Sequence, residues 1–224
     1  MKEGTPLKSA HFGDRVVHCG RGLHTALAVL ITVACTAAMP PEHSQAYEVG
    51  HTSLALVDPS RDNRTVQTEV FYPSAIAGDG VPLAMPPAAG FPAVAFGHGF
   101  LIPLDDYDYI WEGLVPEGFI VLLTDTETGF SPSHLELGLD LAFVLRALRA
   151  ESDETGSLFF QAVSQRGAVC GHSMGGGAAF LGASSDTSVT TLMSLAAAET
   201  NPSAVSAAGA ISASALVVSG SNDC

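Results

Sequence analysis

Lysine and charged residues in general are scarce in this sequence of 224 residues. Charged residues make up 14% of it, and its only lysines, Lys2 and Lys8, lie near the N-terminus. Acidic residues outnumber basic ones by 23 to 9, which gives a formal net charge of −14. A chain this acidic repels nucleic acid phosphates and anionic lipid headgroups, so we expect neither to be a partner.

Cysteine is also rare, which argues against a disulfide-rich protein and a metal protein. The four cysteines are Cys19, Cys35, Cys170 and Cys224, and the first two lie in the N-terminal segment. The remaining two are too few for a disulfide framework. No cysteines and histidines have the spacing of metal ligands, so we expect no metal and no other cofactor.

The first 46 residues differ in composition from those that follow. Four basic residues precede an apolar run over 23–39, and small residues lead up to Ala46. This order is typical of a secretory signal peptide, cut near Ala46 or Ala38. An uncleaved anchor and a lipid-modified Cys35 are the alternatives, since about 17 residues is the short limit for crossing a bilayer. We expect a secreted or periplasmic protein that contacts a membrane only through an uncleaved N-terminal segment.

Patterns of apolar residues after Ala46 predict strands that alternate with helices. Alternating apolar residues predict strands over 49–57 and 64–72, the second closed by Pro73. Short continuous apolar runs are typical of strands buried on both faces. They occur at 92–96, 119–123, 167–170, 190–197 and 215–219.

Three helices are predicted between these strands. The first covers 107–114, with Asp105 and Asp106 as caps, and the second covers 133–150. The third follows the strand at 167–170 and contains the small residues at 176–180. Buried strands that alternate with helices predict one α/β domain over 47–224, a mostly parallel sheet with helices on both faces and no lid.

The segment Gly171-His172-Ser173-Met174-Gly175 is a G-x-S-x-G motif between a predicted strand and a predicted helix. A serine in such a turn is held in a strained backbone conformation, so that its Oγ projects from the edge of the sheet. Side chains at the two glycines would collide with the neighbouring strand and helix. The motif therefore predicts that Ser173 is a nucleophile.

A serine nucleophile needs two backbone N–H groups to stabilise the oxyanion. Met174 follows the nucleophile and supplies one of them. The second is expected from the Gly97-His98-Gly99-Phe100 loop after the strand at 92–96, with Phe100 as the donor. We expect His98 to shape this loop rather than to act as a base.

The order of a catalytic triad in this setting is serine, acid, histidine. Asp223 follows the predicted strand at 215–219 and is the expected acid, with Asp186 and Glu199 as competitors. All eight histidines precede Ser173, so the expected base is absent from the sequence. We therefore expect a C-terminally truncated chain that lacks the last strand and helix of the fold and is inactive or weakly active.

Several stretches together resemble the cutinase-like polyester hydrolases, the platelet-activating-factor acetylhydrolases and the chlorophyllase-like esterases. They are TEVFYP at 68–73, FGHGF at 96–100, GFIV at 118–121, TDT at 124–126, the helix at 133–150, GHSMGGG at 171–177 and SGSND at 219–223. The resemblance implies an α/β-hydrolase fold, Phe100 and Met174 as oxyanion donors, and Ser173 and Asp223 as catalytic residues. Polyester hydrolases carry an aromatic wall after their sixth strand, where this chain has LAAAET at 195–200.

These patterns predict a serine esterase that forms an acyl-enzyme on Ser173. The short interval between Ser173 and Asp223 indicates an open cleft for small-molecule, lipid or polymer esters, and we expect a monomer. Two other classes stay open, because one fold hosts many activities. They are a non-catalytic binding protein and an acyltransferase or peptidase of the same fold.

Overall fold

The computed structural model describes residues 46–221, which build one sheet of eight strands with helices against it. Asp223 and, apart from Ala46, the expected signal segment lie outside these residues. The strands are β1 (Glu48–Asp58), β2 (Arg64–Ser74), β3 (Gly78–Asp79), β4 (Phe91–Gly97), β5 (Ile120–Thr124), β6 (Val163–His172), β7 (Thr191–Leu195) and β8 (Ser214–Val218). The helices are η1 (Leu104–Tyr107), α1 (Asp108–Leu114), α2 (His134–Glu151), α3 (Met174–Ser185), α4 (Ala204–Ala207) and η2 (Ala208–Ala210).

The sheet has the order β3-β1-β2-β5-β4-β6-β7-β8. Neighbours from β5 to β8 run parallel, whereas β2 is antiparallel to both β1 and β5. Every residue of β5 is buried, as the continuous apolar run at 119–123 predicts for a central parallel strand. The mostly parallel α/β sheet expected from the sequence is confirmed.

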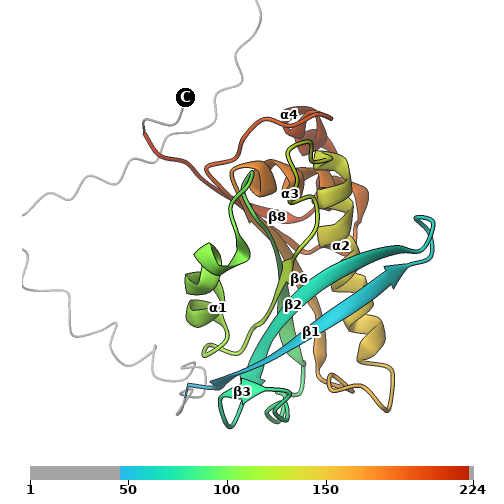
Figure 1. Cartoon of the computed structure of the whole chain (residues 1–224), viewed down its shortest axis with the longest axis vertical. Coiled ribbons are helices and arrows are strands. Elements are labelled where there is room, and N and C mark those ends of the chain that lie inside the picture. Colours follow the sequence, from blue (N-terminus) through green and yellow to red (C-terminus); the bar gives the residue numbers. More distant parts are fainter. Residues whose placement is uncertain (1–45, 222–224) are drawn as a thin grey trace, which may run out of the picture. The chain divides into compact units, whose positions relative to one another are not determined.

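Helices cover both faces of the sheet (Figure 1), with α1 on one side and α2 and α3 on the other. Helix α2 begins after Ser133, whose side chain accepts a hydrogen bond from the Glu136 N–H (3.2 Å). This is an N-cap, and it satisfies a donor that the first turn leaves unpaired. The apolar face predicted for this helix is fully buried and contains Leu141, Val144, Leu145 and Leu148.

Two predictions about strands were wrong. Pro73 does not close β2 but lies inside it, opposite Val49 of β1. Strand β5 pairs with β2 only up to Phe71, and beside Pro73 its place is taken by the loop residue Ala84, whose N–H donates to the Pro73 carbonyl (2.8 Å). Proline has no N–H to donate, so it is tolerated beyond the end of the β2–β5 pairing. The following loop, expected to lack strands, contains β3, which pairs with β1 through Gly50↔Gly78.

The predicted cap of the first helix was also wrong. Asp105 and Asp106 lie inside the 3₁₀ turn η1, which follows Pro103 without a side-chain cap. Tyr107 ends this turn and is buried, so packing of its ring rather than local capping sets the start of α1.

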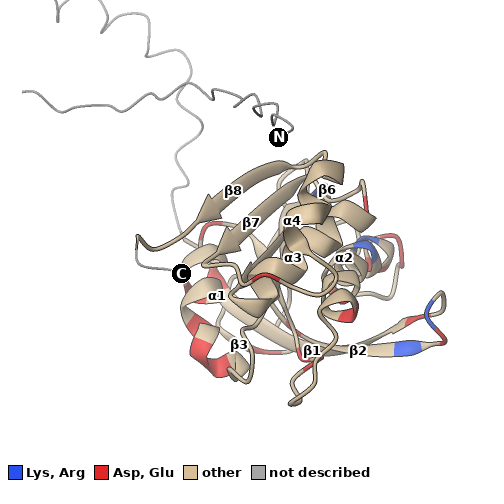
Figure 2. Cartoon of the chain, turned by 90° about the horizontal axis from the view of Figure 1, so that it is seen from above, with Lys and Arg blue, Asp and Glu red and all other residues tan. Residues whose placement is uncertain are grey.

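Charge is distributed unevenly around this sheet. In Figure 2 acidic residues lie along η1 and α1, and basic residues lie on the hairpin between β1 and β2. Within residues 46–221, no helix combines the length and the apolar character needed to cross a bilayer.

Candidate active site

Ser173 is the single residue between the end of β6 and the start of α3. Its backbone has φ 53° and ψ −114°, a left-handed conformation that is strained for a residue with a side chain. Three backbone hydrogen bonds hold the turn: its N–H donates to Leu195 (3.0 Å), and its carbonyl accepts from Gly177 (3.0 Å) and Ala198 (2.9 Å). The turn thus has the strained geometry that the G-x-S-x-G motif predicts.

The glycines on either side of Ser173 are required by close backbone contacts. A Cβ atom on Gly171 would overlap the backbone of Gly175 at the start of α3. A Cβ atom on Gly175 would overlap the carbonyl group of Gly97 at the end of β4. These overlaps involve backbone atoms that cannot rotate away, so β4, β6 and α3 meet here at a separation that only glycine allows.

The loop over 97–100 lies against this turn. Gly97 pairs with Gly171 across β4 and β6, and the Gly175 N–H donates to the His98 carbonyl (3.1 Å). Phe100 is exposed and Met174 is buried. Within the described part of the chain, the backbone N–H groups of both residues lack a hydrogen-bond acceptor. The structure therefore brings together the two loops that contain the predicted oxyanion donors.

His98 is completely buried beneath the loop. Its Nδ1 lies 2.9 Å from the Gly99 carbonyl oxygen, and its Nε2 lies 2.8 Å from the Thr126 carbonyl oxygen. Both ring nitrogens are thus engaged by backbone groups, and the ring connects the loop after β4 to the loop after β5. This geometry agrees with a role in shaping the loop.

A buried network of ion pairs supports the loop after β5, whose Thr126 carbonyl contacts His98. The sequence patterns did not indicate this network. Thr126 donates its hydroxyl to Oδ2 of the fully buried Asp140 (2.7 Å). Arg64 contacts both oxygens of Asp140 at 3.0 and 2.7 Å, and Arg61 contacts Oδ1 at 2.7 Å.

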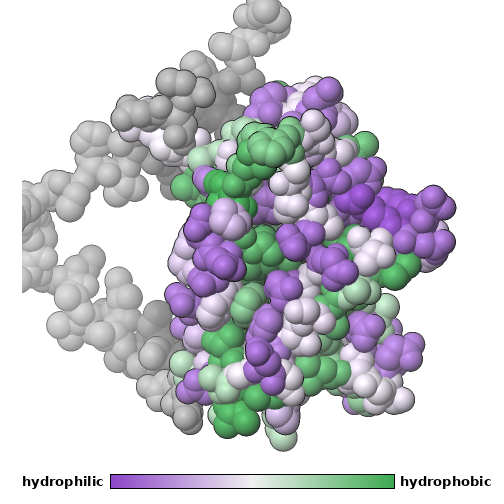
Figure 3. Space-filling view, viewed as in Figure 1, coloured by the Kyte–Doolittle hydropathy of each residue, from purple (hydrophilic) through white to green (hydrophobic). Residues whose placement is uncertain are grey.

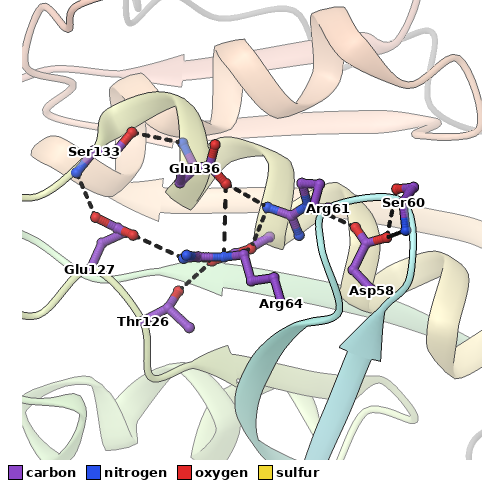
Figure 4. A network of polar contacts seen from close by, with 9 residues as sticks. Asp58, Ser60, Arg61, Arg64, Thr126, Glu127, Ser133 and Glu136 are labelled. Atoms are coloured by element: carbon purple, nitrogen blue, oxygen red, sulfur yellow. Dashed lines mark hydrogen bonds and ion pairs between the residues drawn. The ribbon is translucent and has the colours of Figure 1, made fainter.

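Further acidic groups surround the same arginines, as Figure 4 shows for Asp58, Glu127 and Glu136. The hydrogen bonds with Asp140 raise the pKa of Arg64 above its ordinary value, although burial opposes this shift. Both arginines come from the β1–β2 hairpin, so the network fastens this hairpin to α2 and to the loop after β5. A lone Asp140 amid the apolar residues and glycine at 137–145 was the sequence signal that could have revealed it.

Tyr107 is a second residue whose contacts the sequence patterns did not indicate. Its hydroxyl accepts from the Gly99 N–H (2.8 Å) and lies 2.9 Å from Nδ1 of His172. Burial raises the pKa of Tyr107 above its ordinary value, so the hydroxyl keeps its proton at neutral pH. The residues on the N-terminal side of Phe100 and of Ser173 are therefore joined through one oxygen atom.

The strand before Asp223 also ends close to the Ser173 turn. Val218 of β8 pairs with Leu195 of β7, whose carbonyl accepts the Ser173 N–H. Asp223 itself lies outside the described residues. Of the competing acids, Asp186 caps the opposite end of α3 and pairs with Arg146, whereas Glu199 lies in the loop after β7.

Small residues line the side of the site formed after β7. Ala197, Ala198 and Glu199 are exposed there, and no aromatic side chain occurs between 195 and 200. Next to the loop over 97–100 lies a cavity of about 680 Å³, lined by Glu69, His98, Leu101, Ile102, Pro103, Leu104, Asp105, Asp125 and Thr128. On the face shown in Figure 3, hydrophobic side chains form patches among hydrophilic ones.

Cys170, three residues before Ser173, does not compete with it as a nucleophile. Its thiol is buried in β6, and burial raises the pKa of this thiol to about 12. A thiol with such a pKa is almost entirely protonated at neutral pH, and the thiolate is the reactive form.

Comparison with protein-family models matches residues 42–224 to the family described as PET hydrolase-like. A search of curated proteins finds no match to the chain. The matched region includes the whole sheet and the Ser173 turn, and it confirms the resemblance to cutinase-like polyester hydrolases. This family implies ester hydrolase activity of the α/β-hydrolase type. The chain therefore belongs to the PET hydrolase-like family of α/β-hydrolases.

Proposed function

We propose that the protein hydrolyses carboxylic esters through an acyl-enzyme intermediate on Ser173. The observation that carries the proposal is the strained turn at Ser173, with φ 53° in a residue that is not glycine. Strain of this kind persists where the surrounding structure enforces it, and it is common at active sites. Here the backbone hydrogen bonds of Ser173 with Leu195, Gly177 and Ala198 enforce the strained conformation.

In the proposed reaction, Ser173 Oγ attacks the ester carbonyl and its proton passes to a histidine base. The backbone N–H groups of Met174 and Phe100 stabilise the negative charge that develops on the carbonyl oxygen. Loss of one such donor typically costs about 3–4 kcal/mol of transition-state stabilisation. The base then protonates the leaving alcohol, and water releases the acid. Asp223 orients the base.

The base is not one of the two histidines near Ser173. Both ring nitrogens of His98 lie against carbonyl oxygens, and Nδ1 of His172 lies against Tyr107. All eight histidines precede Ser173 in the sequence, whereas the triad order calls for one after Asp223. We propose that a polypeptide without this histidine is inactive or weakly active. Binding and the oxyanion hole alone leave about 10³-fold catalysis over water.

The substrate that fits this site best is an accessible ester whose binding does not require stacking on an aromatic side chain of the protein. The loop after β7 presents alanines and Glu199 where an aromatic side chain would stack on a terephthalate ring. We propose that short acyl esters are cleaved faster than aromatic polyesters. We also propose that the protein acts as an exported monomer, as members of this family are usually secreted.

The test compares wild-type protein with Ser173→Ala on p-nitrophenyl acetate, p-nitrophenyl butyrate and bis(hydroxyethyl) terephthalate. Each protein is produced as the 224-residue polypeptide and as the polypeptide read from its gene to the next stop codon. We expect the form that contains a histidine after Asp223 to hydrolyse the p-nitrophenyl esters and its Ser173→Ala variant to lose at least about 10³-fold of that rate. Ser206→Ala, which changes an exposed serine in α4, serves as the control. Undiminished hydrolysis by Ser173→Ala would refute the proposal.

A second candidate function is ligand binding without turnover. The observation that favours it is the engagement of His98 and His172 by groups other than Ser173. A fluorophosphonate probe separates the two functions, because it reacts covalently only with an activated serine. Labelling of Ser173 that is absent in Ser173→Ala supports the esterase. An unlabelled Ser173 in both the shorter and the longer polypeptide supports the binding protein.

A further inference from the structure

We propose that Tyr107 is a positioning residue of this site, whose hydroxyl joins the oxyanion loop to the nucleophile turn and selects the tautomer of His172. This inference rests on the proposed function of Ser173 and Phe100. It adds a residue from η1, an element that contains none of the proposed catalytic groups. It also explains why the histidine beside the nucleophile does not act as its base.

The first step of the argument is the pair of contacts at one oxygen atom. The Tyr107 hydroxyl oxygen lies 2.8 Å from the Gly99 N–H nitrogen and 2.9 Å from Nδ1 of His172. Gly99 directly precedes the proposed donor Phe100, and His172 directly precedes Ser173. A displacement of Tyr107 would therefore shift the oxyanion loop relative to the nucleophile.

The second step assigns the hydrogen atoms. The Gly99 N–H can only donate, so the Tyr107 oxygen accepts from it. The Tyr107 side chain is 2% exposed, and a buried hydroxyl without an acceptor is costly. Within the described residues, His172 Nδ1 is the acceptor that lies within reach of this O–H. Tyr107 therefore donates to Nδ1, and the neutral imidazole carries its hydrogen on Nε2.

The third step concerns what this tautomer does. The lone pair of Nδ1 is occupied by the Tyr107 O–H, so this nitrogen cannot take the proton of Ser173. Nε2 carries the hydrogen and has no hydrogen-bond partner among the residues that the structure describes. His172 is partly exposed, so this N–H is a donor available to a ligand next to the nucleophile. Tyr107 thus converts His172 from a competing base into a fixed donor.

The direct test is the tautomer of His172, measured by ¹⁵N NMR of the histidine side chains in the wild-type protein. The His172 signals are assigned by their loss in His172→Gln. We expect Nδ1 to be unprotonated and Nε2 to be protonated. In Tyr107→Phe the signals should shift toward a mixture of the two tautomers. A hydrogen on Nδ1 in the wild type, or identical spectra in Tyr107→Phe, would overturn the proposal.

The functional test compares Tyr107→Phe with Tyr109→Phe, a neighbouring tyrosine that is 57% exposed. In the form of the protein that hydrolyses p-nitrophenyl esters, we expect Tyr107→Phe to lower kcat by about 10–100-fold with little change in KM, because the loop over 97–100 is displaced by a fraction of an ångström. Tyr109→Phe should match the wild type. An unchanged kcat in Tyr107→Phe would contradict the positioning role. The NMR result does not depend on turnover, so failure of the proposed function at Ser173 is recognised separately by Ser173→Ala.

Discussion

Replacement of Asp140 tests whether the buried network in Figure 4 stabilises the fold. The carboxylate is completely buried and is contacted by Arg61, Arg64 and Thr126 at 2.7–3.0 Å. Removal of one partner from a buried ion pair typically costs about 3–5 kcal/mol, because the remaining charge loses its compensation.

The remaining carboxylates of the network limit this loss in Asp140→Ala. Arg61 keeps contacts with Asp58 (2.7 Å) and Glu136 (3.0 Å), and Arg64 keeps Glu127 (2.8 Å). We therefore expect the lower end of the range, about 3 kcal/mol. In a protein of this size, 1 kcal/mol corresponds to about 2–4 °C in Tm, so the expected decrease is about 6–12 °C.

Thermal unfolding followed by circular dichroism measures this decrease. Asp140→Asn is expected to be as unstable as Asp140→Ala. The NH₂ group of asparagine is a hydrogen-bond donor, so it would face the N–H groups of Arg64 or the hydroxyl of Thr126, which also donate at this position. Glu136→Gln is the control, since its side chain is 36% exposed and solvent weakens its ion pairs to about 1 kcal/mol or less. If Asp140→Ala and Glu136→Gln had the same Tm, the network would not contribute as the burial of Asp140 implies.

Two further predictions concern the nucleophile turn and the β1–β3 contact. Gly175→Ala should destabilise the protein by about 3 kcal/mol or more, because its Cβ would overlap the Gly97 carbonyl. Gly113→Ala in α1 has open space and should be neutral or stabilising, by up to about 1 kcal/mol in chemical denaturation. If Gly175→Ala and Gly113→Ala were equally stable, the predicted overlap of the Gly175 Cβ with the Gly97 carbonyl would be contradicted. His51 provides a test with pH: burial lowers its pKa, but hydrogen bonds with Asp79 and Glu69 outweigh burial and raise it. Its stabilising contribution is then complete below about pH 6.5 and is lost as the pH rises through the raised pKa. The Tm difference between wild type and His51→Gln should shrink as the pH rises above about 6.5, and a difference that grows would reverse the assigned sign.

Most strands and the nucleophile turn could be predicted from local sequence. Strands β4 and β5 are buried on both faces, so their sequences are continuous apolar runs that identify them without knowledge of their neighbours. The Ser173 turn is likewise encoded locally, since Gly171 and Gly175 are the residues that the close approach of three backbone segments permits. The roles of Phe100, Met174 and Asp223 stay predictions.

Contacts between distant residues decided the features that the sequence patterns missed. Pro73 occupies a strand because β5 ends its pairing with β2 at Phe71, and nothing in residues 64–74 encodes that endpoint. Asp105 and Asp106 have the composition of helix caps, yet the burial of Tyr107 places them inside a 3₁₀ turn. In both cases contacts with residues distant in the sequence outweighed the conformational preference of the local residues.

The sequence by itself determined the α/β class, the alternation of most strands and helices and the position of the strained serine, because each depends on burial or backbone conformation within a few residues. The tertiary structure alone decided that Tyr107 contacts His172 across 65 residues and that Arg61 and Arg64 enclose Asp140 across about 76. Side chains such as these have no periodic pattern, and their partners are selected by the packing of α1 and α2 on the sheet. The free energy of burying polar groups then requires them to pair wherever packing brings them together.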